Sequence, residues 1–396
     1  MNESGPGTVR HSRPVHTGVI LLLAATFLSI GNFASLMSVI PLWASHGGAG
    51  SSGVGATTGV MLAATVVTQL NMVWLFRLLS LRQMLAVGAL VLAVATPAYV
   101  LTDALAPLVA ISAVRGIGFA FVVVAGVALA AELAPAGKVA TAAGWYGVAA
   151  GLPNVFLMPA GVWLAQTWGF APVFLCAAGM ALLAVPLLLS LPEHGRQARR
   201  TGPRGWVDRR AFTAAGVFLV TAATLGTVAT FLPVALPESP MPSIALFVLS
   251  VVMVATRLGA GALADRHGPG RLVAPSAIVC AVGAAGMAAT VSDGGPALLV
   301  AAAVFGAGFG AAQNDSFVVV LRHLGPGRSG TASTIWNIAY DGGMGVGPFA
   351  VGLALTLTGY PGAFLALAVA LALAAAVGYA VGGPRMGMGV RETPQL

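Results

Sequence analysis

Charged side chains are scarce in this sequence. Only 8% of the 396 residues are Asp, Glu, Lys or Arg, whereas 58% are hydrophobic, and the mean hydropathy is +0.92. Soluble globular domains typically carry about 25% charged residues. This deficit excludes a water-soluble globular protein and indicates a chain that is surrounded by lipid.

Residues suited to covalent or metal chemistry are also few. The two cysteines, Cys176 and Cys280, lie inside apolar stretches, so we expect no disulfide, no metal site and no cofactor. An intramembrane enzyme or lipid-handling protein would need a Ser–His pair or metal ligands within its spans. The histidines instead fall in tails, loops or span ends, at His11, His16, His46, His194, His267 and His323. No P-loop pattern G-x-x-x-x-G-K-[ST] occurs, so we expect neither an enzyme nor an ATP-driven pump.

Long apolar runs fill the rest of the chain. A membrane-spanning helix needs about 20 mostly apolar residues, and an isolated strand would leave backbone groups unpaired in lipid. Twelve stretches meet this requirement: 17–42, 53–76, 83–101, 105–131, 139–165, 169–191, 211–236, 241–263, 272–291, 296–321, 330–356 and 361–383. We therefore predict an all-α integral membrane protein with twelve transmembrane helices.

Basic residues occupy only alternate loops. Outside the spans they are Arg10, Arg13, Arg77, Arg82, Lys138, Arg196, Arg199, Arg200, Arg204, Arg209, Arg210, Arg266, Arg271, Arg322, Arg328, Arg385 and Arg391. The only charged residues in the other loops are Asp103, Glu238 and Asp293. By the positive-inside rule we expect a multi-pass protein of the cell (plasma) membrane with both termini cytoplasmic. The net charge of +8 then reflects topology, and no nucleic-acid partner is expected.

The two halves of the chain repeat one another. "APAGKVATAAGWYGVAAGLPNVFLMPAGVWLAQTWGF", which starts at Ala134, resembles "GPGRSGTASTIWNIAYDGGMGVGPFAVGLALTLTGY", which starts at Gly325. At an offset of 191 the matches are Pro135 with Pro326, Trp145 with Trp336, Gly151 with Gly342, and Gly161 with Gly352. Such a duplication predicts two pseudo-symmetric six-helix bundles with the substrate between them. The expected organisation is a cytoplasmic tail (1–16), a bundle (17–191), a basic cytoplasmic linker (192–210), a second bundle (211–383) and a cytoplasmic tail (384–396).

One loop motif carries a family resemblance. "GALADRHGPGR", residues 261–271, resembles the major facilitator superfamily signature G-x-x-x-D-R-x-G-x-x-R, with matches at Gly261, Asp265, Arg266, Gly268 and Arg271. The resemblance implies the major facilitator fold and a gating latch, in which Asp265 faces the N-terminus of the fifth span near Lys138. The corresponding first-half loop reads "FRLLSLRQ", with Ser80 where the acid would be, so the resemblance implies no such latch there.

Two further stretches resemble a subgroup of that family. "RGIGFA" in the fourth span and "GVAAGLPNVFLMPAG" in the fifth resemble motifs of its proton-coupled drug and small-molecule exporters. The resemblance implies export of a small molecule in exchange for protons by alternating access. A proton-driven importer of a small organic solute remains the alternative. We expect the partners to be this solute, protons and the lipid bilayer, and we expect a monomer.

Four charges lie within the predicted spans. Arg115 and Asp341 fall near the middle of the fourth and eleventh spans, whereas Asp315 and Arg257 lie about 10–12 Å from the inner loops at helical rise. By depth they form a mid-membrane pair and an inner pair. The arginines could serve as counter-charges or bind an anionic group of the substrate, because arginine keeps its proton.

Asp341 has two interpretations. It could pair permanently with a neighbour and fix packing, or it could gain and lose a proton in each transport cycle. A charge at the bilayer centre is disfavoured by at least about 2.5–3.5 kcal/mol, and a face that only packed helices would be less costly with Asn. We predict that Asp341 is the proton-coupling acid, with Asp315 as the alternative and Arg115 as the electrostatic counterweight.

Uncharged polar residues mark a candidate cavity. They are Asn32, Gln313, Asn314, Asn337 and Tyr340. In the superfamily, spans 1, 4, 7 and 10 line the cavity, which favours Asn32, Arg115 and Asn314. Because the seventh span offers only threonines and apolar surface, we expect an amphipathic or largely apolar substrate.

Overall fold

The computed structural model describes residues 15–133, 139–191, 209–267, 270–324 and 329–382. All regular elements within these ranges are helices. In chain order they are α1 (Val15–Leu36), α2 (Val39–His46), α3 (Ser51–Leu70), α4 (Met72–Leu78), α5 (Leu81–Ala95), the 3₁₀ helix η1 (Thr96–Leu101), α6 (Leu105–Glu132), α7 (Val139–Trp168), α8 (Phe170–Leu189), α9 (Arg209–Ala235), α10 (Met241–His267), α11 (Val273–Thr290), α12 (Ala297–Leu324) and α13 (Ser329–Gly382).

Eleven segments of the described residues are long and apolar enough to cross a membrane. The last of them, residues 332–381, covers nearly all of the eleventh and twelfth predicted spans, which Gly359 separates within α13. Gly359 has φ +62°, a backbone conformation that only glycine adopts readily, and it lets the chain reverse direction there. The predicted all-α fold with two six-helix bundles is confirmed, although the second and third spans end in the short elements α4 and η1.

The same turn closes the corresponding pair of helices in the first half. Gly169, between α7 and α8, has φ +86° and ψ 176°, and Gly359 has φ +62° and ψ 176°. Each glycine is followed by an aromatic residue, Phe170 and Tyr360, at the end of the internal repeat. The repeat therefore shares a backbone turn as well as residue matches, with the turn glycines 190 residues apart where the residue matches are 191 apart.

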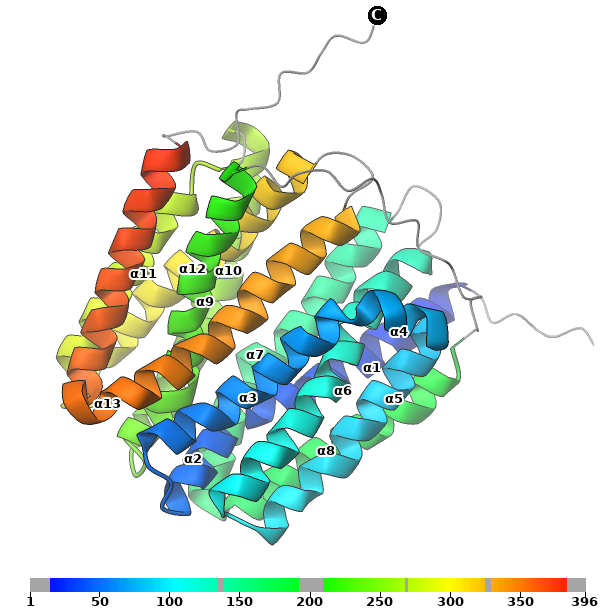
Figure 1. The fold of residues 1–396 in the computed structure, drawn as a ribbon, viewed down its shortest axis with the longest axis horizontal. Coiled ribbons are helices and arrows are strands. Elements are labelled where there is room, and N and C mark those ends of the chain that lie inside the picture. Colours follow the sequence, from blue (N-terminus) through cyan, green and yellow to red (C-terminus); the bar gives the residue numbers. More distant parts are fainter. Residues whose placement is uncertain (1–14, 134–138, 192–208, 268–269, 325–328, 383–396) are drawn as a thin grey trace, which may run out of the picture.

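Helices of each half pack mainly with one another. In the first half α1 packs on α7 and α8, and α6 packs on α3 and α5; in the second, α9 packs on α13, and α12 packs on α10 and α11. The halves meet mainly along two pairs, α3 with α13 and α7 with α10, and α9 also contacts α2 and α3. Figure 1 shows α3 and α13 lying side by side along this junction.

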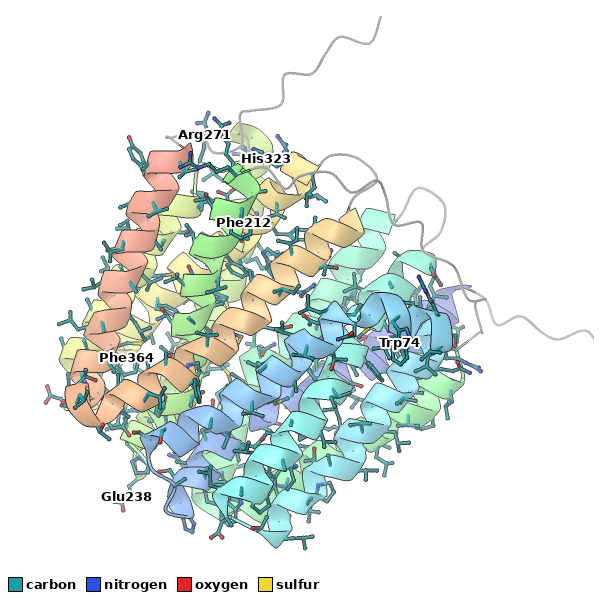
Figure 2. The ribbon with its side chains drawn as sticks, in the orientation of Figure 1. Trp74, Phe212, Glu238, Arg271, His323 and Phe364 are labelled. Atoms are coloured by element: carbon teal, nitrogen blue, oxygen red, sulfur yellow. The ribbon has the colours of Figure 1, made fainter. Side chains whose placement is uncertain are left out.

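The two ends of the bundle differ in charge. Arg271 and His323 lie at one end of the second half and Glu238 at the other (Figure 2). We name the end at Arg271 the basic face and the end at Glu238 the acidic face. The sequence predicts that basic and acidic loops alternate, and in the second half these two kinds of loop lie at opposite ends.

Candidate functional site

A cavity of about 350 Å³ lies between the halves. Its walls come from α1, α6 and α7 of the first half and from α9, α10, α12 and α13 of the second. Most of the lining is apolar, with Phe33, Phe119, Phe317 and several methionines. The volume suits a ligand of drug-like size.

Cross-half contacts close the cavity toward the acidic face. The Ser51 hydroxyl of α3 donates to the Gly352 carbonyl of α13 at 2.8 Å, and the Thr58 and Thr230 hydroxyls are 3.1 Å apart. The Gln166 side-chain amide of α7 donates to the carbonyls of Pro237 at 2.9 Å and Ser239 at 3.1 Å. In the other direction the lining extends to Ala130, Tyr146 and Ser333, near the basic ends of α6, α7 and α13.

Glycines bring α3 and α13 into backbone contact. A Cβ atom on Gly352 would approach the Ser51 carbonyl oxygen, and one on Gly55 would approach the Pro348 carbonyl oxygen, both far inside contact distance. Because neither backbone can yield to a side chain, the seam closes only with glycine at these points. We call this contact, from Ser51–Gly352 at the acidic face to Gln69–Asp341, the α3–α13 seam.

Asp341 lies at the basic end of this seam. Its side chain is only 3% exposed, and it lines the cavity. Its Oδ2 accepts a hydrogen bond of 2.6 Å from the Gln69 side-chain amide of α3. The carboxylate of one half is therefore bonded to a neutral amide of the other.

Asp315 has partners of a different kind. Its side chain is 1% exposed and does not line the cavity. Oδ1 accepts from the Gly270 N–H at 2.8 Å and Oδ2 from the Leu272 N–H at 2.7 Å, just before α11 begins at Val273. A carboxylate there satisfies free amide groups and complements the helix dipole. Asp315 thus joins α12 to the start of α11 within one half.

Arg115 is fully buried, with 0% exposure. Its guanidinium donates to the Asn32 side-chain oxygen at 2.9 Å and lies 5.6 Å from the centre of the Tyr99 ring. The Asn32 amide in turn donates to the Thr96 hydroxyl at 3.0 Å and the Ala177 carbonyl at 2.9 Å. Neither Arg115 nor Asn32 lines the central cavity, although both lie in helices expected to form it.

Arg257 faces the cavity from α10. It shares one face of the helix with Ser250, Met253 and Val254, which also line the cavity. Its side chain is exposed, and no carboxylate of the described residues is bonded to it. Tyr340 lies within electrostatic range of both Arg257 and Asp341. None of the four charges predicted to lie within spans is therefore bonded to another. Asp341 and Arg115 have neutral side-chain partners, and backbone N–H groups bind Asp315. Arg257 is open to the cavity.

The remaining predicted polar residues of the cavity meet there. Gln313, Asn314, Asn337 and Tyr340 all line it. The Asn337 amide is bonded to the Ser333 carbonyl at 2.9 Å, whereas Gln313 Oε1 and Asn314 Nδ2 have no hydrogen-bond partner within the described part of the chain.

Several lining residues were not anticipated from the sequence. Gln69, which does not line the cavity itself but bonds Asp341 at its wall, gives no charge signal, although it is the only Gln in its predicted span. The rings of Trp336 and Tyr340, one helical turn apart on α13, are nearly parallel, at 4° with centroids 5.7 Å apart. Their i, i+4 spacing is the signal that could have predicted this aromatic wall.

The gating signature is described only in part. Gly261 lies on α10 beside Asn314, Arg266 and Arg271 are exposed, and Gly270 forms a turn with φ +85°. The side chain of Asp265, Gly268 and the expected partner near Lys138 lie outside the described residues, so the latch stays a prediction. Among the described residues no cluster of His, Cys, Asp or Glu could hold a metal ion.

Comparisons with known proteins place the fold. The family model described as Major Facilitator Superfamily matches residues 22–348 and 243–386. Similar solved structures include a bacterial homolog of the human lysosomal transporter Spinster in an inward-facing, occupied conformation, at 16% identity over 96% of this chain and 100% of that one, with a TM-score of 0.76. They also include the inward open xylose transporter XylE from E. coli, at 14% identity over 96% and 98%, with a TM-score of 0.75.

The nucleoside transporter NupG is similar as well, at 15% identity over 92% of this chain and 99% of that one, with a TM-score of 0.72. No curated protein sequence matches the chain. Because the family model covers most of the sequence and the structures share its architecture, the chain belongs to the Major Facilitator Superfamily and is a secondary transporter, not an enzyme.

Proposed function

We propose that this transporter exports a small amphipathic organic molecule in exchange for protons, by alternating access, with Asp341 as the coupling acid. The observation that carries this proposal is the Gln69–Asp341 hydrogen bond, which joins the two halves at the wall of the cavity. A proton that binds to Asp341 changes this contact between α3 and α13. Closure of the cavity toward the acidic face depends on that contact.

The direction of that change follows from the hydrogen bond. An ionised carboxylate accepts a bond from an amide about twice as strongly as a neutral acid does. Ionised Asp341 therefore stabilises the closed α3–α13 seam, and protonation weakens it. Closure toward the acidic face, together with a cavity that extends toward the basic face, matches an inward-facing state if the basic face is cytoplasmic.

Asp315 supports transport in another way. Its two backbone bonds hold the loop of the gating signature against α12. Within the described part of the chain, no bond across the halves involves its carboxylate in this conformation. We therefore assign the coupling role to Asp341 first and keep Asp315 as the alternative acid.

Import driven by protons is the second candidate. The observation that favours it is the open charge of Arg257, which lines the same cavity as Asp341 and lies within electrostatic range of Tyr340. An anionic solute that fills the cavity between Arg257 and Asp341 would favour protonation of Asp341, because like charges disfavour each other's ionised forms. Solute and proton would then bind together and cross in the same direction.

An accumulation screen tests the proposal. Cells with and without the protein are loaded with a panel of amphipathic dyes and antibiotics, with and without a proton-gradient uncoupler. Export predicts that at least one compound accumulates less when the protein is present and that the uncoupler removes this difference. If uncoupler-sensitive accumulation rises instead, the protein is an importer, and if neither changes for any compound, proton coupling is contradicted.

A further inference from the structure

Among the described residues, the cavity offers a ligand one accessible full charge, and that charge is positive. Of the four charges within the predicted spans, Arg115 and Asp315 do not line the cavity. Asp341 lines it but is almost fully buried and already accepts the Gln69 bond. Arg257 lines it, is exposed, and has no carboxylate bonded to it in the described residues.

A second hydrogen-bond donor lies close to Arg257. Gly310 of α12 packs against α10 so closely that a Cβ atom on it would lie 2.9 Å from the Arg257 backbone nitrogen. Asn314 is one turn further along α12, beside Gly261, which is one turn further along α10. Asn314 lines the cavity, and its buried Nδ2 atom has no partner in the described residues. A guanidinium and an amide donor within about one helical turn suit an anionic oxygen group.

Aromatic rings border this charged corner. Trp336 and Tyr340 line the cavity, and Phe218 stacks behind them at 4.9 Å and 5.9 Å between centroids. Phe317 meets Trp336 edge-on at 5.5 Å. Ring faces fixed in this way favour a flat, apolar ring in a ligand.

We propose that the cavity binds an aromatic organic anion, with a carboxylate or sulfonate group at Arg257 and Asn314 and its ring system against Trp336 and Tyr340. This inference rests on the proposed transport function and adds the substrate class to it. It holds for export and for import, because it concerns which ligand charge the cavity binds and not the direction of transport.

A matched probe panel tests the inference. Binding of 2-naphthoate, 2-naphthalenesulfonate, 2-naphthylmethanol and 2-naphthylmethylamine to the purified full chain in lipid nanodiscs is measured by calorimetry and by quenching of tryptophan fluorescence. The anions should bind about tenfold or more tightly than the alcohol, as expected for a charge-assisted hydrogen bond, and the amine should bind most weakly.

Three variants isolate the arginine. Arg257→Gln should remove the advantage of the anions while keeping the affinity for the alcohol, which also shows that the variant is folded. Arg257→Lys should retain part of that advantage. Arg77→Gln, which removes an exposed arginine away from the cavity, should bind the whole panel as the wild type does. The inference is overturned if the amine binds more tightly than the anions, if Arg257→Gln changes anion affinity by less than twofold, or if no anion binds.

Transport assays separate this inference from the proposed function. If anions bind through Arg257 but a proton gradient moves none of them in proteoliposomes, the proposed coupling fails while the substrate class stands. If a proton gradient moves the amine or the alcohol but not the anions, the coupling stands and the substrate class is wrong.

Discussion

Asp341 and Asp315 are two buried carboxylates of the same half with opposite kinds of partner. Asp315 accepts two backbone N–H bonds from residues 270 and 272 and so joins α12 to the start of α11. Asp341 accepts one side-chain bond from Gln69, which belongs to the other half. A carboxylate whose partners lie in its own half strengthens that half, whereas one whose partner lies across the junction can control whether the halves separate.

The largest effect should come from removing the titratable group at the junction. Asp341→Asn keeps the shape and can still accept from Gln69, but it cannot exchange a proton. Uphill, gradient-driven transport should fall by more than about tenfold, the usual scale for losing a positioned proton-transfer group. Downhill exchange should stay partly intact, and Asp341→Glu should retain some coupling.

Proteoliposome assays with an imposed pH gradient provide the measurement, and Asp103→Asn, in a loop of the acidic face, is the matched control. If Asp341→Asn and Asp315→Asn each still concentrate substrate with the wild-type response to pH, neither acid is solely required for coupling.

Loss of the anchoring carboxylate should affect stability instead. Asp315→Ala removes two charge-assisted bonds and leaves two N–H groups at the start of α11 without these acceptors. The free energy of unfolding should fall by about 3 kcal/mol. Denaturation followed by tryptophan fluorescence would measure it, with Asp293→Ala, an exposed loop acid, as the control. If Asp341→Ala were equally destabilising and Asp315→Ala were neutral, the contrast between the two acids would be reversed.

The seam itself can be opened without touching either acid. Gly352→Ala places a Cβ atom against the Ser51 carbonyl, so the closed seam should lose about 1–3 kcal/mol relative to the open state. Double electron–electron resonance between spin labels at Asp103 and Glu238 should then report longer distances. Gly151→Ala, which meets no atom within contact distance, is the control. Equal distances in both variants would show that the seam is not tight at Gly352.

The smallest expected effect belongs to the neutral partner. Gln69→Leu keeps the acid but removes the bond across the halves. Because the acid still titrates, coupled transport should persist, with its rate lowered a few-fold and with a weaker dependence on pH. Transport rates at several pH values would test this. A loss as complete as that of Asp341→Asn would mean that Gln69 itself takes part in proton transfer.

The sequence was sufficient for the parts of the molecule that hydropathy controls. Apolar runs and alternating basic loops predict the helices and the family signature predicts the fold, because lipid leaves the chain few other structures. Asp341 could be singled out by the cost of a charge in lipid.

Partners could not be predicted in the same way. Gln69 is separated from Asp341 by 272 residues, and a neutral amide gives no charge signal. Likewise, the amides that hold Asp315 belong to the backbone of a loop 43–45 residues earlier, which no side-chain pattern reveals.

The most direct test of the account is the response of the α3–α13 seam to protons. Spin labels at Ser52 and Leu357, both exposed near the acidic end of the seam, would report its width by double electron–electron resonance once Cys176 and Cys280 are replaced. The account predicts a short, narrow distance distribution at high pH, where Asp341 is ionised, and a longer or broader one at low pH. It also predicts that Asp341→Asn gives the low-pH distribution at every pH. A wild-type distribution that does not change with pH, or an Asp341→Asn variant that responds as the wild type does, would contradict the claim that Asp341 controls the junction.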